Sequence, residues 1–185
     1  MSAAVEAALG EAPAVAQASL EEIRRRLADM VASFWKSPIG RRLRTAKHVY
    51  REMPFLLKVD QTEISGTMDL VFEGADGEWE VVDYKSSSPP AGPHDDLRPD
   101  YRLQLGLYAL AARQWLGRPL TRWSVFFLGR GVAFEEMVTP GGIESASREI
   151  RKALEKTTIG SYNNYSEQSA CPTCRYAALC GTGSA

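Results

Sequence analysis

The stretch G-T-M-D-L-V-F-E-G-A-D-G-E-W-E-V-V-D-Y-K, residues 66–85, decides how the chain is expected to fold. Its centre, E-G-A-D-G-E, has the glycine and acidic residues of a tight turn, and the flanking segments are apolar enough for strands. Asp69 lies seven residues before Asp76 in this turn and Asp83 seven after it, so a hairpin would bring the two carboxylates side by side. Lys85 is two residues beyond Asp83 and is expected on the same face of its strand, because side chains alternate along a strand.

The segments around this hairpin predict a mixed sheet covered by helices. Their apolar residues recur with the helical or the strand period, and turn residues separate them. In chain order we expect a helix over 19–34, a short helix from 37, strands over 49–59, 64–72 and 79–84, a helix over 101–115, strands over 121–128 and 132–138, and a helix over 142–156. The first three strands would form an antiparallel meander, and the whole order indicates an α/β domain.

Composition excludes some classes of function. The 185 residues suffice for one domain with a small appendage, and 22 basic against 23 acidic residues give no global sign of nucleic-acid or membrane binding. No apolar run approaches the roughly 18 residues that would span a bilayer, so no membrane partner is expected.

The cysteines Cys171, Cys174 and Cys180 cluster near the C-terminus. An odd, clustered set suits a metal site or free thiols in a reducing compartment, and the cytoplasm is the expected location.

Basic residues are concentrated in the N-terminal helical part, where they have two interpretations. The first is that they lie on solvated helix faces, and the second is that they bind a phosphate backbone beside an active site. The residues are Arg24, Arg25, Arg26, Arg41, Arg42, Arg44 and Lys47.

The two aspartates and Lys85 together suggest metal chemistry. Two buried carboxylates without a counterion are costly, and a divalent cation would relieve that cost. Mg²⁺ takes oxygen ligands and is typically held by one or two carboxylates plus a substrate phosphate. Lys85 would then orient an attacking water or stabilise the charge that builds on the phosphorus centre. The alternative is a structural Asp–Lys pair on a sheet surface, with Asp69 simply exposed.

The helix over 101–115 adds a polar pair to this candidate site. Gln104 and Tyr108 are four residues apart and so share one helix face, where an amide and a phenol would hold a phosphate or a strand near the metal. The alternative for this pair is one packing residue and one surface residue. The apolar stripe of the same helix is predicted at Leu103, Leu107, Leu110 and Ala111.

Four motifs in this order carry a resemblance to a known family: R-E-M-P-F (51–55), G-T-M-D (66–69), V-V-D-Y-K-S (81–86) and Q-L-G-L-Y (104–108). The chain resembles the PD-(D/E)XK nuclease superfamily, in particular the RecB-type branch at the C-terminus of AddA-type helicase–nuclease subunits. The resemblance implies a restriction-endonuclease-like α/β fold, with a mixed central sheet flanked by helices. It also implies a metal-dependent DNA nuclease, expected to be an exonuclease, that uses Mg²⁺ or Mn²⁺.

The resemblance further implies roles for individual residues. Asp69, Asp83 and the backbone carbonyl of Tyr84 would hold the metal, and Lys85 would be catalytic. Gln104, Tyr108 and Glu52 would act beside them in catalysis.

The sequence departs from the resembled branch in two places. Relatives usually carry an upstream histidine as a further metal ligand, and Glu6 stands about where that histidine would fall. The C-terminal Cys-x2-Cys-x5-Cys resembles part of a four-cysteine iron–sulfur site but lacks a fourth cysteine. It is interpreted first as a degenerate remnant, and otherwise as a zinc site or a cluster whose fourth ligand lies elsewhere.

The resemblance also predicts domain organisation and partners. We expect a nuclease domain over 1–165, made of a helical part over 1–48 and a catalytic core over 49–138, followed by a cysteine-containing tail over 166–185. The expected partners are DNA and a helicase motor or a second helicase–nuclease subunit, in double-strand break repair. No G-x-x-x-x-G-K-[ST] motor motif occurs in these residues. The alternatives are a catalytically inactive DNA-binding or scaffolding module and a CRISPR-associated exonuclease with an iron–sulfur cluster.

Overall fold

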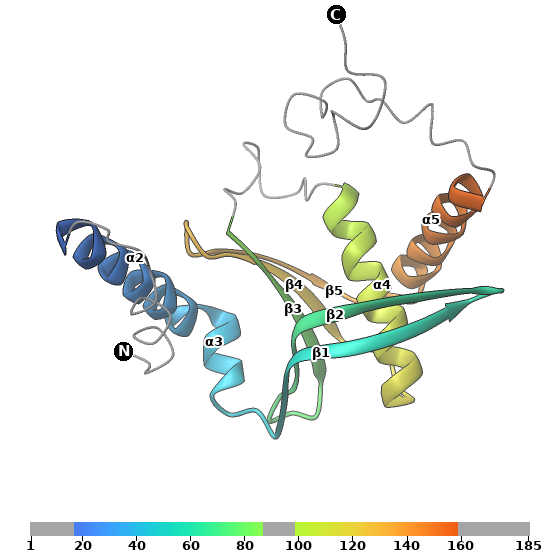
Figure 1. The fold of residues 1–185 in the computed structure, drawn as a ribbon. Coiled ribbons are helices and arrows are strands. Elements are labelled where there is room, and N and C mark those ends of the chain that lie inside the picture. The colour runs from blue at the N-terminus through green and yellow to red at the C-terminus, as the bar shows by residue number, and fades with distance from the viewer. Residues whose placement is uncertain (1–16, 87–98, 159–185) are drawn as a thin grey trace, which may run out of the picture. The chain divides into compact units, whose positions relative to one another are not determined.

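The computed structural model describes residues 17–86 and 99–158 (Figure 1). Its elements are α2 (Gln17–Lys36), α3 (Pro38–Leu43), β1 (His48–Val59), β2 (Thr62–Glu73), β3 (Trp79–Lys85), α4 (Pro99–Leu116), β4 (Arg122–Phe127), β5 (Val132–Met137) and α5 (Pro140–Thr158). Each predicted helix and strand is present, with bounds that differ by no more than two residues where both ends were predicted. The chain divides into two compact units, Met1–Ser147 and Arg148–Ala185, so α5 begins in the first unit and ends in the second.

The five strands form one mixed sheet in the order β1-β2-β3-β4-β5. The first three strands pair antiparallel, as the predicted meander requires. Helix α4 then crosses over so that β4 lies parallel to β3, and β5 returns antiparallel. The α/β fold class predicted from the order of elements is confirmed.

The turn between β2 and β3 sets the pairing register of the two strands that carry Asp69 and Asp83. Gly74 donates its N–H to the carbonyl of Glu78 at 2.8 Å, and Gly77 takes a φ of 86°, which favours glycine. The ladder pairs Phe72 with Glu80 and Leu70 with Val82. One further step in the same register brings Asp69 level with Asp83, which is the arrangement predicted from their equal spacing about the turn.

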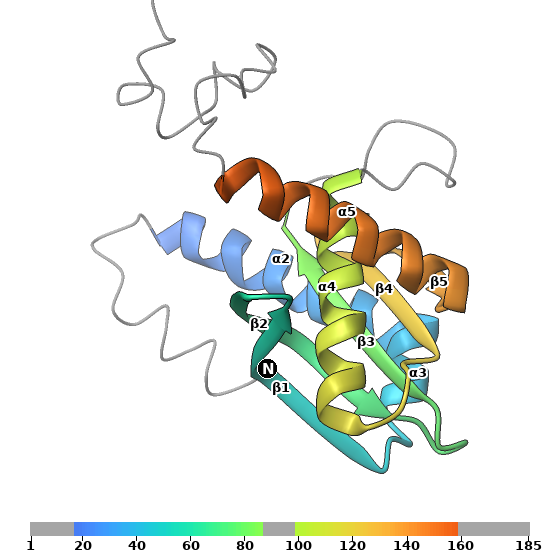
Figure 2. The ribbon, with the colours of Figure 1, turned by 90° about the vertical axis from the view of Figure 1, so that its right-hand side faces the viewer.

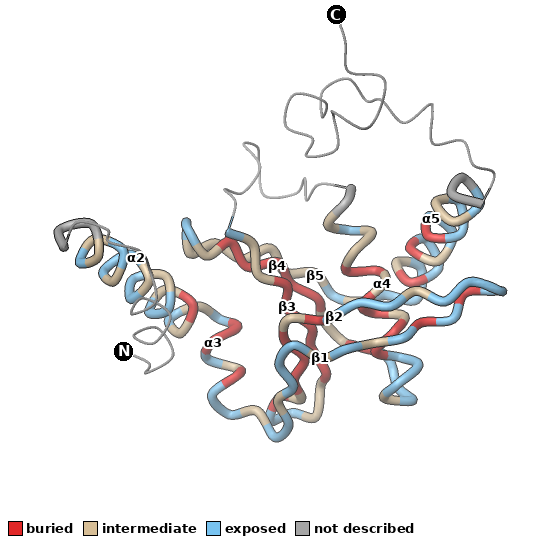
Figure 3. The backbone as a smooth tube through the Cα atoms, in the orientation of Figure 1, coloured by how far each residue is buried: buried red, intermediate tan, exposed pale blue. Residues whose placement is uncertain are grey.

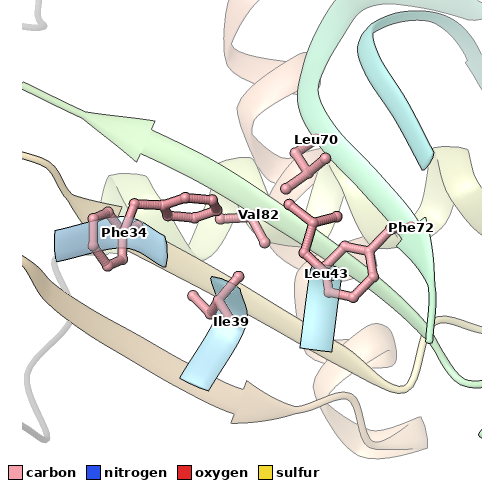
Figure 4. Close-up of a cluster of buried hydrophobic side chains, with 7 residues drawn as sticks. Phe34, Ile39, Leu43, Leu70, Phe72 and Val82 are labelled. Carbon is pink, nitrogen blue, oxygen red and sulfur yellow. The ribbon is translucent and has the colours of Figure 1, made fainter. Parts of the chain in front are cut away.

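Helices cover the two faces of the sheet differently (Figure 2). On one face, side chains of α2 and α3 point toward side chains of β2 to β4 and form a buried apolar cluster (Figure 4). The cluster consists of Phe34, Ile39, Leu43, Leu70, Phe72, Val82 and Phe126. The buried residues of β3 and β4 form the centre of the sheet (Figure 3). Side chains alternate along β3, so Val81, Asp83 and Lys85 face the other side, where α4 lies.

The predicted apolar stripe of α4 is only partly correct. Ala111 is buried, but Leu103, Leu107 and Leu110 are each only partly buried. The fully buried apolar positions are instead Leu105, Ala109, Ala111 and Ala112. Three of these four positions are alanines, and the predicted leucines lie at partly buried positions of the helix.

The basic residues of the N-terminal part also have two different fates. On α2, Arg24 pairs with Glu21, while Arg25 and Arg26 pair with Glu22, as expected of a solvated helix face. A solvated face was the wrong prediction for Arg42, whose side chain is only 26% exposed and binds Glu80 on the sheet. Spacings of three and four residues identify the local pairs, but no local pattern indicates a partner on a distant strand.

The β1–β2 hairpin bends where the site is built. Glu52 takes a φ of 49° and is skipped by the ladder, which passes from Arg51–Leu70 to Met53–Met68. Beyond this bend the two strands continue as a two-stranded ribbon past the rest of the sheet (Figures 1 and 3). No helix in the described ranges 17–86 and 99–158 is long and apolar enough to cross a membrane.

Candidate active site

The end of β3 carries a buried ion pair. The side chain of Asp83 is 3% exposed and that of Lys85 is 22% exposed, and Lys85 Nζ lies 2.7 Å from Asp83 Oδ2. Both side chains project toward α4, as the alternation along the strand predicted. The structural Asp–Lys interpretation therefore gets one part right, because the pair exists, but it is not a surface pair.

Gln104 of α4 connects the two members of this pair. Its amide Nε2 donates to Asp83 Oδ1 at 2.9 Å, and its Oε1 accepts from Lys85 Nζ at 2.9 Å. The opposite amide orientation would set oxygen against carboxylate and NH₂ against ammonium. The charges of Asp83 and Lys85 thus determine how the amide lies, and the amide in turn holds both side chains in place.

Tyr108 lies one helical turn further along α4. Its hydroxyl oxygen accepts the second N–H of Gln104 Nε2 at 2.7 Å. Burial, with the nearby charges of Asp83 and Asp69, raises the pKa of Tyr108 to about 12. The phenol therefore keeps its proton at neutral pH, and its interaction with Asp83 helps to lower the pKa of that carboxyl.

Asp69 approaches the same strand end from β2. Its Oδ2 accepts the backbone N–H of Tyr84 at 2.7 Å, so the carboxylate is anchored to the main chain between Asp83 and Lys85. Asp69 is partly buried, which differs from the simply exposed residue of the structural alternative. Its negative charge acts on Asp83 and raises the pKa of that carboxyl.

The surroundings of Asp83 disfavour its charged form. Burial raises its pKa above the usual value, Asp69 adds to this, and Lys85 and Tyr108 only partly offset it. Despite the short distance to Lys85, Asp83 Oδ2 accepts no hydrogen bond of good geometry from any residue in the described part of the chain. A buried carboxylate oxygen in such surroundings is a site that a further cation would stabilise.

The donor set fits a hard divalent cation. Asp69 and Asp83 offer carboxylate oxygens, which are the ligands that Mg²⁺ prefers, and Mg²⁺ commonly takes only one or two carboxylates from the protein. Within residues 17–86 and 99–158, no three or more His, Cys, Asp or Glu side chains gather as a metal-binding group. The remaining positions would therefore fall to water, to a backbone carbonyl such as that of Tyr84, or to substrate oxygens.

Other predicted residues lie beside this cluster or outside the described chain. Glu52 is exposed and lies between the pairs Arg51–Leu70 and Met53–Met68 of the β1–β2 ladder, which leaves it across from Asp69. Burial raises the pKa of the Tyr84 phenol to about 12, and Asp69 and Glu52 add to this rise. Glu6, the loop after Ser86 and the whole tail over 166–185, with Cys171, Cys174 and Cys180, lie outside the described residues.

Sequence reasoning missed Tyr101, which caps Lys85. The Lys85 ammonium lies 5.2 Å from the centre of the Tyr101 ring, and that ring packs edge-on against Phe127. The signal was present, because Tyr101 precedes Gln104 by three residues and so shares its helix face.

Comparison with known proteins agrees with this geometry. The sequence profile described as the PD-(D/E)XK nuclease superfamily matches residues 1–181. The chain therefore belongs to the PD-(D/E)XK nuclease superfamily, as its motifs predicted.

Individual relatives refine the comparison. The chain is 33% identical to the AddA-type ATP-dependent helicase/nuclease subunit of Heliobacterium modesticaldum, over 61% of this chain and 9% of that protein. It is 29% identical to the protein of the same name from Pelotomaculum thermopropionicum, over 57% of this chain and 9% of the relative. The matched region is thus a small part of either relative, and the resemblance to AddA-type proteins is confirmed.

A solved structure supports the fold. The crystal structure of an exonuclease candidate from Eubacterium rectale aligns with a TM-score of 0.50 and 13% sequence identity, covering 71% of this chain and 51% of that one. At this identity the likeness concerns the fold alone.

Proposed function

We propose that this chain is a metal-dependent deoxyribonuclease whose active site, at the end of β3, hydrolyses phosphodiester bonds. The observation that carries the proposal is the buried Asp83 carboxylate. It has a second carboxylate in Asp69 close by, and its Oδ2 is paired with the Lys85 ammonium at 2.7 Å without a hydrogen bond of good geometry. Membership in a nuclease superfamily supports the assignment.

Asp69 and Asp83 would hold a divalent cation, Mg²⁺ or Mn²⁺, with the Tyr84 carbonyl as a further ligand. When bound, this cation would polarise the scissile phosphate and lower the pKa of a water molecule. The hydrogen bond from Tyr84 N–H to Asp69 Oδ2 at 2.7 Å leaves Oδ1 for this purpose. On Asp83, Gln104 binds Oδ1 and Lys85 Nζ lies 2.7 Å from Oδ2, so the cation would bind Oδ2 beside the ammonium.

Lys85 would act on the reacting phosphate. Its positively charged ammonium would stabilise the negative charge that builds on the phosphate oxygens in the transition state. Gln104 Oε1 at 2.9 Å and the Tyr101 ring restrict where this ammonium lies, so little reorganisation is needed during the reaction. Tyr108, which stays protonated because its pKa is about 12, would donate a hydrogen bond to a substrate oxygen.

We further propose that the enzyme digests DNA from an end and works with a helicase during double-strand break repair. The support is the similarity to proteins named as subunits of an ATP-dependent helicase/nuclease. The motor would lie in another part of a longer polypeptide or in a separate protein.

The test is digestion of end-labelled linear DNA by the full chain, with Mg²⁺, with Mn²⁺ and with EDTA. We expect metal-dependent cleavage that is lost in Asp83→Ala and Lys85→Ala and kept in the matched controls Asp29→Ala and Lys58→Ala, whose side chains are exposed. A parent chain that binds DNA but cleaves none with either metal would overturn the proposal in favour of the inactive binding module. Iron and sulfide in the purified chain would instead favour the iron–sulfur exonuclease.

A further inference from the structure

The β1–β2 ribbon contains a glycine at a position where a side chain would clash with a neighbouring ring, although its backbone angles would suit any residue. Gly66 pairs with Phe55 across the ribbon, and it is not among the residues with positive φ. A Cβ added at Gly66 would lie 2.8 Å from both Cε1 and Cζ of Phe55. The Phe55 ring therefore lies over the bare backbone of Gly66, and any larger residue there must displace the ring.

The displaced ring would lose its contact with the candidate site. Phe55 packs edge-on against Tyr108, with ring centres 5.8 Å apart and planes inclined at 76°. Tyr108 is only 6% exposed, so its ring is confined by its neighbours. Because edge-to-face packing depends on the relative position of the two rings, a shift of Phe55 changes the surface that confines the Tyr108 ring.

Tyr108 passes any such movement on to the reacting groups. Its hydroxyl holds Gln104 Nε2 at 2.7 Å, and the same amide binds Asp83 and Lys85. We propose that Phe55, seated on Gly66, is a positioning residue that fixes Tyr108 and, through Gln104, the Asp83–Lys85 pair. This proposal rests on the nuclease function proposed above.

The ribbon itself does not depend on Phe55 for its attachment. Leu57 and Val59 of β1 and Met68 of β2 are buried, whereas Phe55 is only partly buried. Loss of the Phe55 ring should therefore cost less stability than loss of a core residue. A change in catalysis without a change in fold is consequently the expected result.

A double-mutant cycle on DNA cleavage by the full chain tests the proposal. We expect Gly66→Ala and Phe55→Ala each to lower kcat by about 10-fold, since small misplacements of catalytic groups are costly, while KM for DNA changes by less than about twofold. The double variant should lose no more than Phe55→Ala alone, because an alanine at position 66 fits once the ring is gone. A second cycle, Phe55→Ala with Tyr108→Ala, should be equally non-additive.

Two control variants separate positioning from general damage. Leu56→Ala changes the neighbouring side chain, which is 60% exposed, and Gly141→Ala adds a Cβ with no atom within 4 Å. Both should keep the parent kcat. Circular dichroism and thermal unfolding establish that each variant is folded, and the Phe55 variants keep the test valid should Gly66→Ala fail to fold.

Three results would overturn the proposal. The first is a kcat within twofold of the parent for folded Phe55→Ala. The second is a double variant whose loss equals the product of the single losses, because the two residues would then act independently. The third is an equal fall of kcat in the controls. A parent chain that cleaves no DNA refutes the nuclease function instead, and this role with it.

Discussion

Strand β3 carries two almost completely buried carboxylates, one on each face, and they differ in how they are compensated. The side chains of Glu80 and Asp83 are each 3% exposed. Glu80 receives two hydrogen bonds from one guanidinium, Arg42 Nε to Oε1 at 2.7 Å and Arg42 Nη2 to Oε2 at 2.8 Å. Asp83 has Gln104 on one oxygen, and its other oxygen pairs with the Lys85 ammonium at 2.7 Å without a hydrogen bond of good geometry.

We interpret this difference as the one between a structural ion pair and the proposed functional one. Burial would lower the pKa of Arg42, but its hydrogen bonds to Glu80 and Glu135 outweigh that effect and raise it. On the other face, burial raises the pKa of Asp83 in spite of Lys85. The cluster of Glu80, Arg42 and Glu135 therefore stabilises its charged groups. The surroundings of Asp83 instead disfavour its charged form, which is typical of residues that serve binding or catalysis.

The largest expected effect is on catalysis at the Asp83 face alone. We expect Lys85→Ala to lower the rate of DNA cleavage by roughly 10²–10³-fold, the usual cost of removing one group that stabilises transition-state charge. Glu80→Gln, on the opposite face of the same strand, should remain within about threefold of the parent if it folds. Initial rates under saturating DNA and Mn²⁺ measure both. Equal losses in the two variants would break the comparison.

The second effect is on stability at the Glu80 face. Arg42→Ala leaves Glu80 buried without its main partner, and we expect the free energy of unfolding to fall by about 3–5 kcal/mol. Arg25→Ala, which removes an exposed pair on α2, should cost no more than about 1 kcal/mol. Urea unfolding followed by circular dichroism provides the values. A loss as small for Arg42 as for Arg25 would contradict a structural role for this network.

The third predicted effect is a gain of stability, at the Asp83 face. Without metal, Asp83→Asn should stabilise the chain at neutral pH by about 1 kcal/mol, the scale of one poorly satisfied buried polar group. Because the folded pKa of Asp83 is raised, its contribution to stability is fully present below the unfolded pKa and is lost as pH rises through the folded pKa.

Thermal unfolding in EDTA as a function of pH checks this sign. The advantage of Asp83→Asn over the parent should grow as pH rises through the folded pKa and then level off. A variant that is less stable than the parent at neutral pH would show that Lys85 compensates Asp83 fully.

The smallest effect concerns the aromatic cap on Lys85. A cation–π contact of this kind is worth about 0.5–1 kcal/mol, so Tyr101→Leu should lower the cleavage rate by roughly 2- to 5-fold. Tyr101→Phe keeps the ring face and should match the parent. Equal rates for Leu and Phe at this position would remove Tyr101 from the site.

Local sequence predicted one of the two carboxylate clusters and not the other. Asp69 and Asp83 are symmetric about a strong turn, and strand alternation then places Lys85 with Asp83. Helix spacing puts Gln104 and Tyr108 on one face, and the family resemblance assigned that face to the site. These rules act over a few residues, so they can be applied before the fold is known.

The remaining contacts depend on distances that only the folded chain sets. Arg42 meets Glu80 across 38 residues, and no local pattern joins them. Glu52 was expected to act beside the catalytic residues; its φ of 49° interrupts the ladder across from Asp69, a local bend that no sequence pattern announced. Helix α4 was predicted by its leucines, yet three of its four fully buried apolar positions are alanines.

Calorimetric titration of Mn²⁺ into the metal-free full chain at neutral pH tests the central claim most directly. The account predicts saturable binding in the parent and in Glu80→Gln, and no measurable binding in Asp83→Asn. Binding to Asp83→Asn with the affinity of the parent would contradict it, because Asp83 would then not be the carboxylate that a metal ion stabilises.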